Sequence, residues 1–353
     1  INTYNLATSI PEYVWEALRR NPVQSNVILP LAEKAFLHEE STGDALDNRQ
    51  LWITCVSTAE SNPGSTHHAV ELVLAFSKNA LGDYPLFIVP TVSLSLLPRQ
   101  LLTPRLHMLI PVILDHFSPS RVYSVFAPEP VAELFARIWS ESTQISHYPD
   151  PYYAASLVFC TQRSFNNRPE PTMQDGSRYQ LRPAILSDLE AVAKLCLEFS
   201  QLSEPFLLCW NGAVKEAEAL ISNKQVWVHE YFLDDFNRSG LAEGSGSSSE
   251  ITCIVAFTRN TRINSTITKV VTSDSHRGLG CAQRLVRQVC KHMLYEEGKQ
   301  SIALYVAHDN ISARKVYHNV GFVGLDEPEH SVEGVERWSE IGFDRTKVQL
   351  GHW

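Results

Sequence analysis

The sequence lacks any long apolar run. Although 44% of its 353 residues are hydrophobic, no stretch approaches the length of about 20 apolar residues that a helix needs to cross a bilayer. A chain of this length is sufficient for about two domains, each with its own buried core. We therefore expect a two-domain globular protein without a membrane partner. A cytoplasmic location is expected from the cysteines, whose odd number and lack of C-x-x-C pairs are typical of structural thiols in a reducing compartment.

Positive charge is also scarce. The 30 Lys and Arg residues are outnumbered by 39 Asp and Glu residues, which gives a formal net charge of -9. Nucleic-acid binding draws its affinity from basic surfaces that displace counterions from phosphates. The acidic balance therefore argues against a nucleic-acid partner, and it mildly favours cationic small molecules.

Spacings typical of metal, disulfide and serine-hydrolase sites are missing. The seven cysteines include no C-x-x-C pair and lie within apolar patterns, as small hydrophobic residues do. His67 and His68 have no companions at metal-ligand spacing, so no metal is expected. The G-x-S-x-G motif is absent as well.

Two polar stretches interrupt the chain. Residues 164–178 carry prolines without periodicity, which is typical of a linker. Residues 237–249 are rich in Ser and Gly and predict a flexible loop between two strands. The first interruption divides the chain into an N-terminal domain, 1–163, a linker, 164–178, and a second domain, 179–353.

The second half has a clear order of elements. Its hydrophobic periodicity predicts strands at 179–184, 226–233, 251–258 and 266–272, then at 301–307, with a final strand pair within about 335–350. Helices are expected at 188–200, 211–222, 280–297 and 311–319. This order predicts a mixed α/β layer built on one sheet.

The first half is less regular. Strands are expected at 51–57, 69–76, 85–91, 121–127 and 153–160, and helices at about 11–20, 100–117 and 128–140. This order roughly echoes that of the second half. No glycine-rich loop precedes the helix at 100, where the sequence reads LLPRQLLTPR.

Residues 272–282, TSDSHRGLGCA, follow an apolar run and precede a helical pattern. Amides at a helix N-terminus bind phosphate readily, and glycine lets a ligand approach the backbone. Arg277 adds a fork-shaped cation. We interpret the loop as a phosphate cradle. The alternative is a plain turn in which Gly278 and Gly280 only relieve crowding, and neither the dinucleotide fingerprint nor the P-loop is complete.

A second pattern lies at 304–322, LYVAHDNISARKVYHNVGF. It places Asn310 after a predicted strand, and Ala313 and Tyr317 four residues apart on one helix. Together with R-x-x-G-x-A in the loop, it resembles the GNAT superfamily of acyl-CoA-dependent N-acetyltransferases, over about residues 178–350. The whole chain is similar to fungal proteins of this superfamily that have an extra N-terminal half.

The resemblance implies a mixed sheet that is flanked by helices and splays open after its fourth strand. The pantetheine arm of acetyl-CoA would lie in the opening, paired with the strand end like an added strand, and the loop amides would hold the pyrophosphate. The residues that the resemblance assigns to acetyl-CoA are Val270, Val271, Thr272, Arg277, Gly278, Leu279, Gly280, Cys281, Ala282, Asn310 and Ala313. It also implies that the first half is a degenerate copy that binds no acyl-CoA.

Acylation of an amine by a thioester needs a polarised carbonyl and a proton for the departing sulfur. A backbone N–H near Val271 is expected to hold the carbonyl oxygen. Tyr317 is the predicted general acid, which would protonate the sulfur of CoA. The alternative for Tyr317 is a core aromatic on a helical stripe with Val316 and Val320.

The general base has several candidates. Glu230 is the first choice, because its strand borders the acceptor site in this fold. His229 alternates with it and must face the other side of the sheet. The pair at 308–309, His-Asp, and Glu340 stay open, as does a chain of water molecules.

These observations predict an N-acetyltransferase that acylates the amine of a small molecule or amino-acid-like acceptor. Residues 203–212 are expected to contribute to the acceptor site, with Phe206 and Trp210 either as its wall or as core. The alternatives are a catalytically silent acyl-CoA-binding or scaffold protein, and an O-acyltransferase of a secondary metabolite. The sequence specifies neither the acceptor, nor acetyl against longer acyl groups, nor the oligomeric state.

Overall fold

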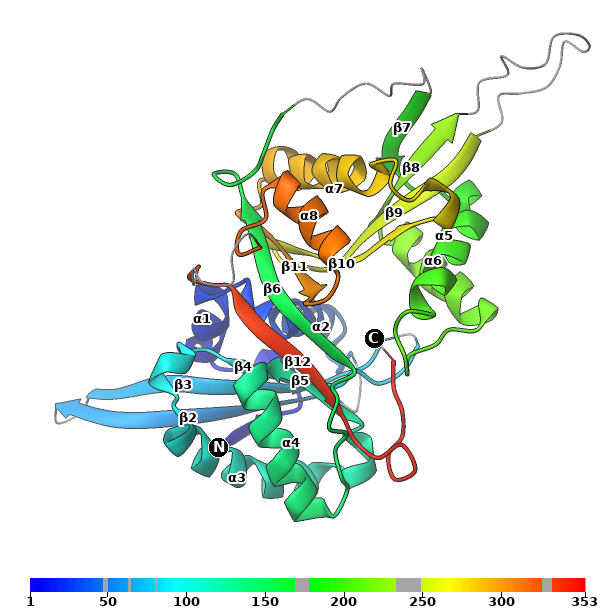
Figure 1. The fold of residues 1–353 in the computed structure, drawn as a ribbon. Helices are drawn as coiled ribbons and strands as arrows, with labels where there is room; N and C mark the ends of the chain where they lie inside the picture. The colour runs from blue at the N-terminus through cyan, green and yellow to red at the C-terminus, as the bar shows by residue number, and fades with distance from the viewer. Residues whose placement is uncertain are drawn as a thin grey trace, which may run out of the picture. The chain divides into compact units, whose positions relative to one another are not determined.

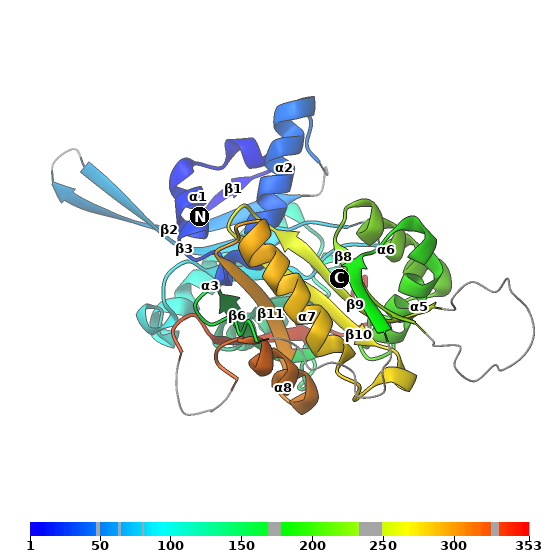
Figure 2. The same ribbon diagram turned by 90° about the horizontal axis from the view of Figure 1, so that it is seen from above.

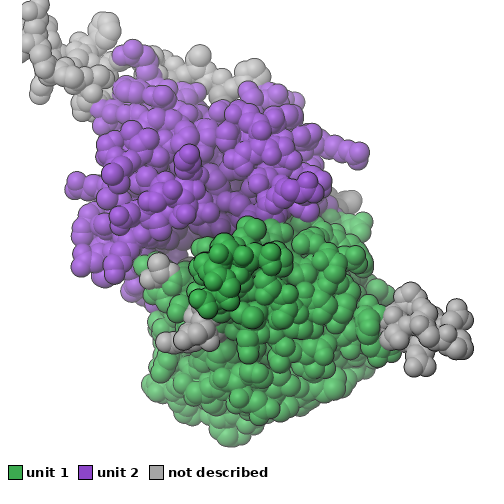
Figure 3. All heavy atoms as spheres, turned by 180° about the vertical axis from the view of Figure 1, so that it is seen from behind, with its two compact units in different colours: residues 1–157, 306–309, 333–353 green, residues 158–305, 310–332 purple. Residues whose placement is uncertain are grey.

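The computed structural model describes residues 1–46, 50–62, 65–79, 81–168, 178–232, 249–325 and 332–352. It divides into two compact units: unit 1, residues 1–157, 306–309 and 333–353, and unit 2, residues 158–305 and 310–332 (Figure 3). The predicted loop after residue 236 and most of the predicted linker lie outside the described residues. No helix in the described part of the chain is long and apolar enough to cross a membrane.

Unit 2 contains a mixed sheet in the order β7-β8-β9-β10-β11 (Figure 1). Neighbouring strands are antiparallel from β7 to β10, and β11 runs parallel to β10. The strands are β7 (Arg178–Pro183), β8 (Val226–Phe232), β9 (Ser249–Asn260), β10 (Asn264–Thr272) and β11 (Ser301–Ala307). The helices are α5 (Leu189–Ser200), α6 (Trp210–Ser222), α7 (Cys281–Lys291) and α8 (Ile311–Val320).

Helices cover both faces of this sheet, because side chains alternate along its strands. Val226 and Val228 of β8 join the apolar core beneath α5 and α6. Trp227 and His229 face the other way, toward α7 and its continuation, where they contact His292 and Arg284. Figure 2 shows α7 lying across the strands on this face.

The sheet opens between β10 and β11. Their parallel pairing runs only from Asn264–Ser301 to Ile267–Leu304, while β10 continues to Thr272. On its other side, β10 has an irregular register with β9 between Thr266 and Lys269, and such bulges bend a strand. The splay after the fourth strand of the unit is confirmed, as is the mixed, helix-flanked sheet.

Unit 1 repeats this arrangement. A short strand is followed by two helices, three antiparallel strands, a helix, a strand parallel to the last one, and a further helix. These elements are β1 (Asn2–Tyr4), α1 (Glu12–Arg20), α2 (Leu29–Thr42), β2 (Leu51–Asn62), β3 (Ser65–Phe76), β4 (Leu86–Pro90), α3 (Arg99–His116), β5 (Ser124–Pro128) and α4 (Glu129–Thr143). The first half is therefore a second copy of the same architecture.

The last strand of the chain completes the sheet of unit 1. β12 (Glu336–Gly342) follows α8 in sequence, yet it pairs antiparallel with β5 and with β6 (Tyr153–Thr161). Trp338 on β12 is fully buried. The compact units therefore group residues 333–353 with the first half, and the predicted domain limits stay a prediction. The expected final strand pair is a single strand, because turns follow Phe343 in the described residues.

Candidate functional site

The connection from β10 to α7 is an exposed loop with two glycines in the left-handed region. Gly278 has φ +80° and Gly280 has φ +78°, conformations that other residues adopt only with strain. A Cβ added at Gly278 would meet nothing within 4 Å, whereas one at Gly280 would lie 3.0 Å from Nη1 of Arg284. Both glycines are therefore required by their positive φ angles, and Gly280 is also required by the close approach of Arg284.

Helix α7 begins without a side-chain cap and without an acidic residue in its first turn. Within the described chain, the amides of Cys281, Ala282 and Gln283 have no hydrogen-bond acceptor. Unpaired amides and the positive end of the helix dipole therefore face the loop. A helix start of this kind is suited to an anion, and the phosphate cradle itself stays a prediction.

Arg277 is largely exposed at the tip of the loop. Its Nη2 pairs with Oδ1 of Asp274 at 2.9 Å, and its Nε donates to the carbonyl oxygen of Thr272 at 3.4 Å. Such an exposed ion pair contributes little stability. The guanidinium is thus available to exchange Asp274 for an anionic ligand.

The end of β10 presents a backbone edge to the opening in the sheet. On the opposite side, the amide of Ser273 donates to the carbonyl oxygen of Thr252 at 2.9 Å. Because alternate residues of an antiparallel ladder bond to the same neighbour, Val271 also faces β9. The N–H groups of Val270 and Thr272 therefore face the opening, rather than that of Val271.

Two predicted residues lie on α8. Asn310 caps this helix: its Oδ1 accepts from the amide of Ala313 at 3.0 Å and from Oγ of Ser312 at 3.1 Å. Tyr317 is buried, with its ring centroid 5.7 Å from that of Phe322. The Asn in the motif thus has a clear capping role beside any role in binding.

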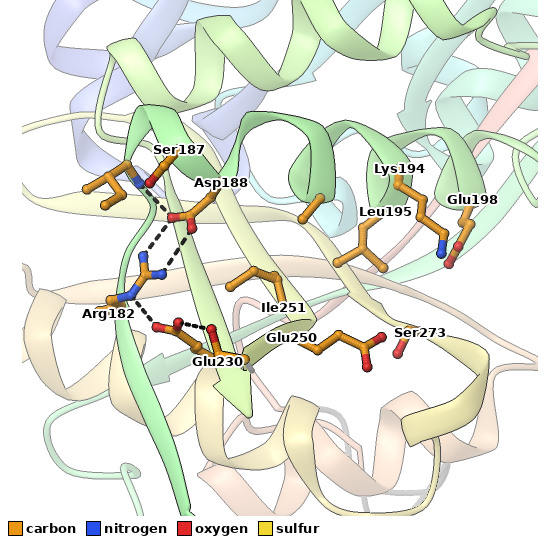
Figure 4. Close-up of a pocket in the computed structure, with 13 residues that line it drawn as sticks. Arg182, Ser187, Asp188, Lys194, Leu195, Glu198, Glu230, Glu250, Ile251 and Ser273 are labelled. Carbon is orange, nitrogen blue, oxygen red and sulfur yellow. Dashed lines mark hydrogen bonds and ion pairs between the residues drawn. The ribbon is translucent and has the colours of Figure 1, made fainter. Parts of the chain in front are cut away.

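An open cavity of about 580 Å³ lies between one side of α5 and the ends of β7, β8 and β9 (Figure 4). Its lining residues are Arg182, Ile185, Ser187, Asp188, Ala191, Lys194, Leu195, Glu198, Glu230, Ser249, Glu250, Ile251 and Ser273. Figure 4 shows Glu250 beside Ser273. Since Ser273 begins the glycine loop, the cavity reaches the predicted phosphate cradle.

Arg182 joins two carboxylates at one end of the cavity (Figure 4). Its Nη atoms donate to both oxygens of Asp188, at 2.6 and 3.0 Å, and its Nε donates to Oε2 of Glu230 at 2.8 Å. Burial raises the pKa of Glu230, but hydrogen bonds from Arg182 and Ser249 outweigh it, so the pKa is lowered overall. Glu230 is therefore ionised and a weak base.

At the other end of the cavity, a carboxylate lacks a hydrogen-bond donor. Oε2 of Glu198 is buried without a hydrogen-bond partner in the described structure. Glu250 also lines the cavity, and Figure 4 shows Lys194 as the cation near Glu198. An ammonium group would supply the missing donors.

The remaining sequence candidates are dispersed. Glu340 belongs to unit 1, where it is buried and accepts from Oγ of Ser124 at 2.6 Å. Residues 308 and 309 also belong to unit 1. Phe206 is buried in the core, whereas Trp210 is exposed. Among the residues with described positions, no group of three or more metal-ligating side chains occurs.

Sequence reasoning missed two arginines. Arg182 organises the cavity, and Arg284 lies buried beneath the glycine loop, where Nη2 donates to the carbonyl oxygen of Leu279 at 2.6 Å. Neither position stands out in the sequence, because an isolated Arg on a strand or an amphipathic helix is usually solvated. Arg182 follows from the register of β7 with β8, which brings it near Glu230.

The comparison with protein families matches residues 249–331 to the model described as FR47-like protein. This segment is thus similar to the FR47-like family, which is related to the GNAT superfamily. The FR47-like segment contains β9, β10, the glycine loop, α7, β11 and α8. It holds every residue predicted to bind acetyl-CoA, and Tyr317, but not Glu230.

Known structures resemble the chain in fold. A Drosophila protein aligns with a TM-score of 0.54 and 9% identity, over 94% of this chain and 96% of that one. A GCN5-related N-acetyltransferase from Sphaerobacter thermophilus has a TM-score of 0.48 at 13% identity, over 91% and 88%. A tandem GNAT protein from the clavulanic acid biosynthesis pathway has a TM-score of 0.42 at 12% identity, over 82% of each chain. No curated protein sequence matches.

Proposed function

We propose that the protein is an acyl-CoA-dependent N-acyltransferase, which moves an acetyl or other acyl group from its CoA thioester to the amine of a small-molecule or amino-acid-like acceptor. One observation carries the proposal: the FR47-like segment combines an opening between β10 and β11 with a glycine loop that leads into the unpaired amides of α7. An open strand edge suits an extended amide-containing arm, and the helix start suits a diphosphate.

The residues present fit this co-substrate. The diphosphate would be held by the amides from Gly278 to Ala282 and by Arg277, whose present partner is exposed. The pantetheine arm would pair with the backbone edge of Val270 and Thr272, whose N–H groups face the opening. Asn310 and Ala313 would flank it from the start of α8. This assignment retains the residues that the GNAT resemblance implies.

The thioester supplies an activated acyl carbon. During transfer the amine nitrogen bonds to this carbon, the carbon–sulfur bond breaks, and the amine loses a proton while the sulfur gains one. An amide of β10 that faces the opening would polarise the carbonyl. In this proposal the phenol of Tyr317 gives its proton to the sulfur.

The acceptor would enter the cavity beside the glycine loop. The unpartnered oxygen of Glu198 and a second carboxylate of the lining, Glu250, favour a cationic amine over a neutral alcohol. Glu230, the predicted base, is engaged by Arg182 and Ser249, so it is better suited to attract the amine than to deprotonate it. Solvent would then take the amine proton.

The first test is thermal unfolding with acetyl-CoA, CoA and NADH. A ligand at about 100 times its dissociation constant stabilises by roughly 2.7 kcal/mol, so acetyl-CoA and CoA should raise the Tm while NADH should not. A panel of amines and matched alcohols is then assayed for release of free thiol from acetyl-CoA. Binding without turnover on any acceptor would favour the silent acyl-CoA-binding protein, and turnover on alcohols alone would favour the O-acyltransferase.

A further inference from the structure

Arg284 is a buried cation in the first turn of α7. The residue is 7% exposed, and its Nη2 atom donates to the carbonyl oxygen of Leu279 at 2.6 Å. Leu279 lies between the two left-handed glycines of the loop. The guanidinium therefore holds the carbonyl group around which the loop turns.

The surroundings of Arg284 supply no negative charge. Its guanidinium carbon lies 4.9 Å from the ring centroid of Tyr179, and its Nε donates to Nε2 of His229 at 3.5 Å. No carboxylate in the described part of the chain lies within ion-pair distance of Arg284. Buried charges in proteins are usually paired, so this one is an exception that calls for a counter-charge.

His229 contributes an acceptor and no charge. Burial, followed by the charge of Arg284, lowers its pKa to about 4. The neutral ring can donate through Nδ1 to Oγ1 of Thr252 at 2.9 Å, while Thr252 donates to the carbonyl oxygen of His229 at 3.2 Å. This tautomer leaves Nε2 as the acceptor for Arg284.

The helix adds to the positive field. A cation in the first turn is disfavoured by the positive end of the helix dipole, and α7 has no acidic residue there to offset it. Exceptions to the rules of helix stability are expected mainly at functional sites. An anion above the loop would relieve both the unpaired guanidinium and the unpaired amides.

We propose that Arg284 is a positioning residue for the diphosphate of the acyl-CoA co-substrate. It fixes the turn at Leu279 from beneath, and its buried positive charge is neutralised when the diphosphate binds above. Gly280 contributes to the same arrangement, because a side chain at this position would contact Nη1 of Arg284. The inference rests on the proposed function and assigns this role to a residue outside the R-x-x-G-x-A motif.

The test compares Arg284→Met, Arg284→Lys and a control, Lys291→Met. Lys291 is exposed in the last turn of the same helix, so its loss removes a charge without touching the loop. Dissociation constants are measured by calorimetry for CoA, for inorganic pyrophosphate, and for S-acetylpantetheine, which lacks the diphosphate. Folding of each variant is checked by circular dichroism and by unfolding without ligand.

Arg284→Met should weaken binding of CoA and pyrophosphate by about tenfold to a hundredfold, the scale of a lost charge-assisted contact. Binding of S-acetylpantetheine should be unchanged. Arg284→Lys should restore part of the loss, and Lys291→Met should match the wild type. In turnover, the KM for acetyl-CoA should rise while kcat at saturation is retained.

Other outcomes separate the two proposals. If Arg284→Met binds CoA as tightly as the wild type, or loses S-acetylpantetheine equally, the role of Arg284 is refuted while the proposed function stands. If the wild type binds CoA, and Arg284→Met weakens this binding, but no acyl group is transferred, the role of Arg284 is supported and the proposed activity is refuted. If the wild type binds neither CoA nor pyrophosphate, both are refuted.

Discussion

Nε of Arg182 donates to Oε2 of Glu230 at 2.8 Å, while its Nη atoms bind Asp188. Ser249 donates to the other oxygen of Glu230 at 2.7 Å. Both oxygens of Glu230 are therefore occupied at the rim of the cavity. Because these hydrogen bonds outweigh the effect of burial and lower its pKa overall, the carboxylate has little affinity for a proton near neutral pH.

Glu230→Gln should therefore reduce kcat/KM by less than about tenfold, which is small for the loss of a general base, worth about a hundredfold or more. The pH profile of kcat/KM above pH 6 should keep its shape. The measurement is a steady-state profile for wild type and variant on the best acceptor. A loss of about a hundredfold together with a missing ionisation would instead establish Glu230 as the base that the sequence predicts.

Tyr317→Phe should lower kcat by about a hundredfold, since it removes the proton offered to the sulfur. CoA affinity should stay within about twofold of wild type, because the ring and its contact with Phe322 are kept. Tyr295→Phe, at an exposed tyrosine of the same unit, is the control and should have no effect. If Tyr317→Phe keeps the turnover of the wild type, Tyr317 is a core aromatic residue and not the general acid.

Most elements of unit 2 were predictable from the sequence, because their hydrophobic periodicity and the residues that mark their ends indicate the same helices and strands. Helix α7 begins at Cys281, one position after the expected start. Helix α2, by contrast, was missed because its buried face includes Glu39, which breaks the apolar stripe. Glu39 accepts from the amides of Ala7 and Thr8, contacts that no local pattern indicates. The pairing of β12 within unit 1 likewise depends on residues far away in the sequence, so no local pattern indicates it.

The candidate site was predictable where backbone geometry dictates the residue. Gly278 and Gly280 are required by positive φ, and such positions are visible in a sequence. The partners of Arg284 and Arg182 were not predictable from the sequence, because an arginine is exposed to solvent on most helices and strands. Their roles depend on how α7 packs against β8 and on the register of β7 with β8. Sequence alone therefore locates the loop but not the charges beneath it and beside it.

Gly278→Ala and Gly280→Ala form a matched pair. Both place a side chain at positive φ, so each should destabilise the fold by about 1 kcal/mol. Only the alanine at position 280 meets Nη1 of Arg284. We expect Gly280→Ala to weaken CoA binding severalfold more than Gly278→Ala, as measured by calorimetry alongside urea unfolding. Equal losses of affinity would mean that the contact with Arg284 does not shape the loop.

The buried His229 should make folding stability depend on pH. Its pKa falls from 6.5 to about 4 on folding, through burial first and then the charge of Arg284. Between these values the unfolded state binds more protons than the native state, so stability falls as pH falls from about 6.5 to 4. The full effect is about 3 kcal/mol, an order-of-magnitude figure.

His229→Gln removes this titration while offering an amide near Arg284 and Thr252. The variant should lose part of its stability at pH 7, and its unfolding free energy should change less than that of wild type between pH 6.5 and 4.5. His116→Gln, at an exposed histidine of α3, should keep the wild-type slope. Urea denaturation at several pH values measures both slopes. Parallel curves for wild type and His229→Gln would show that His229 titrates alike in the folded and unfolded states, and would contradict the neutral acceptor assigned to it beside Arg284.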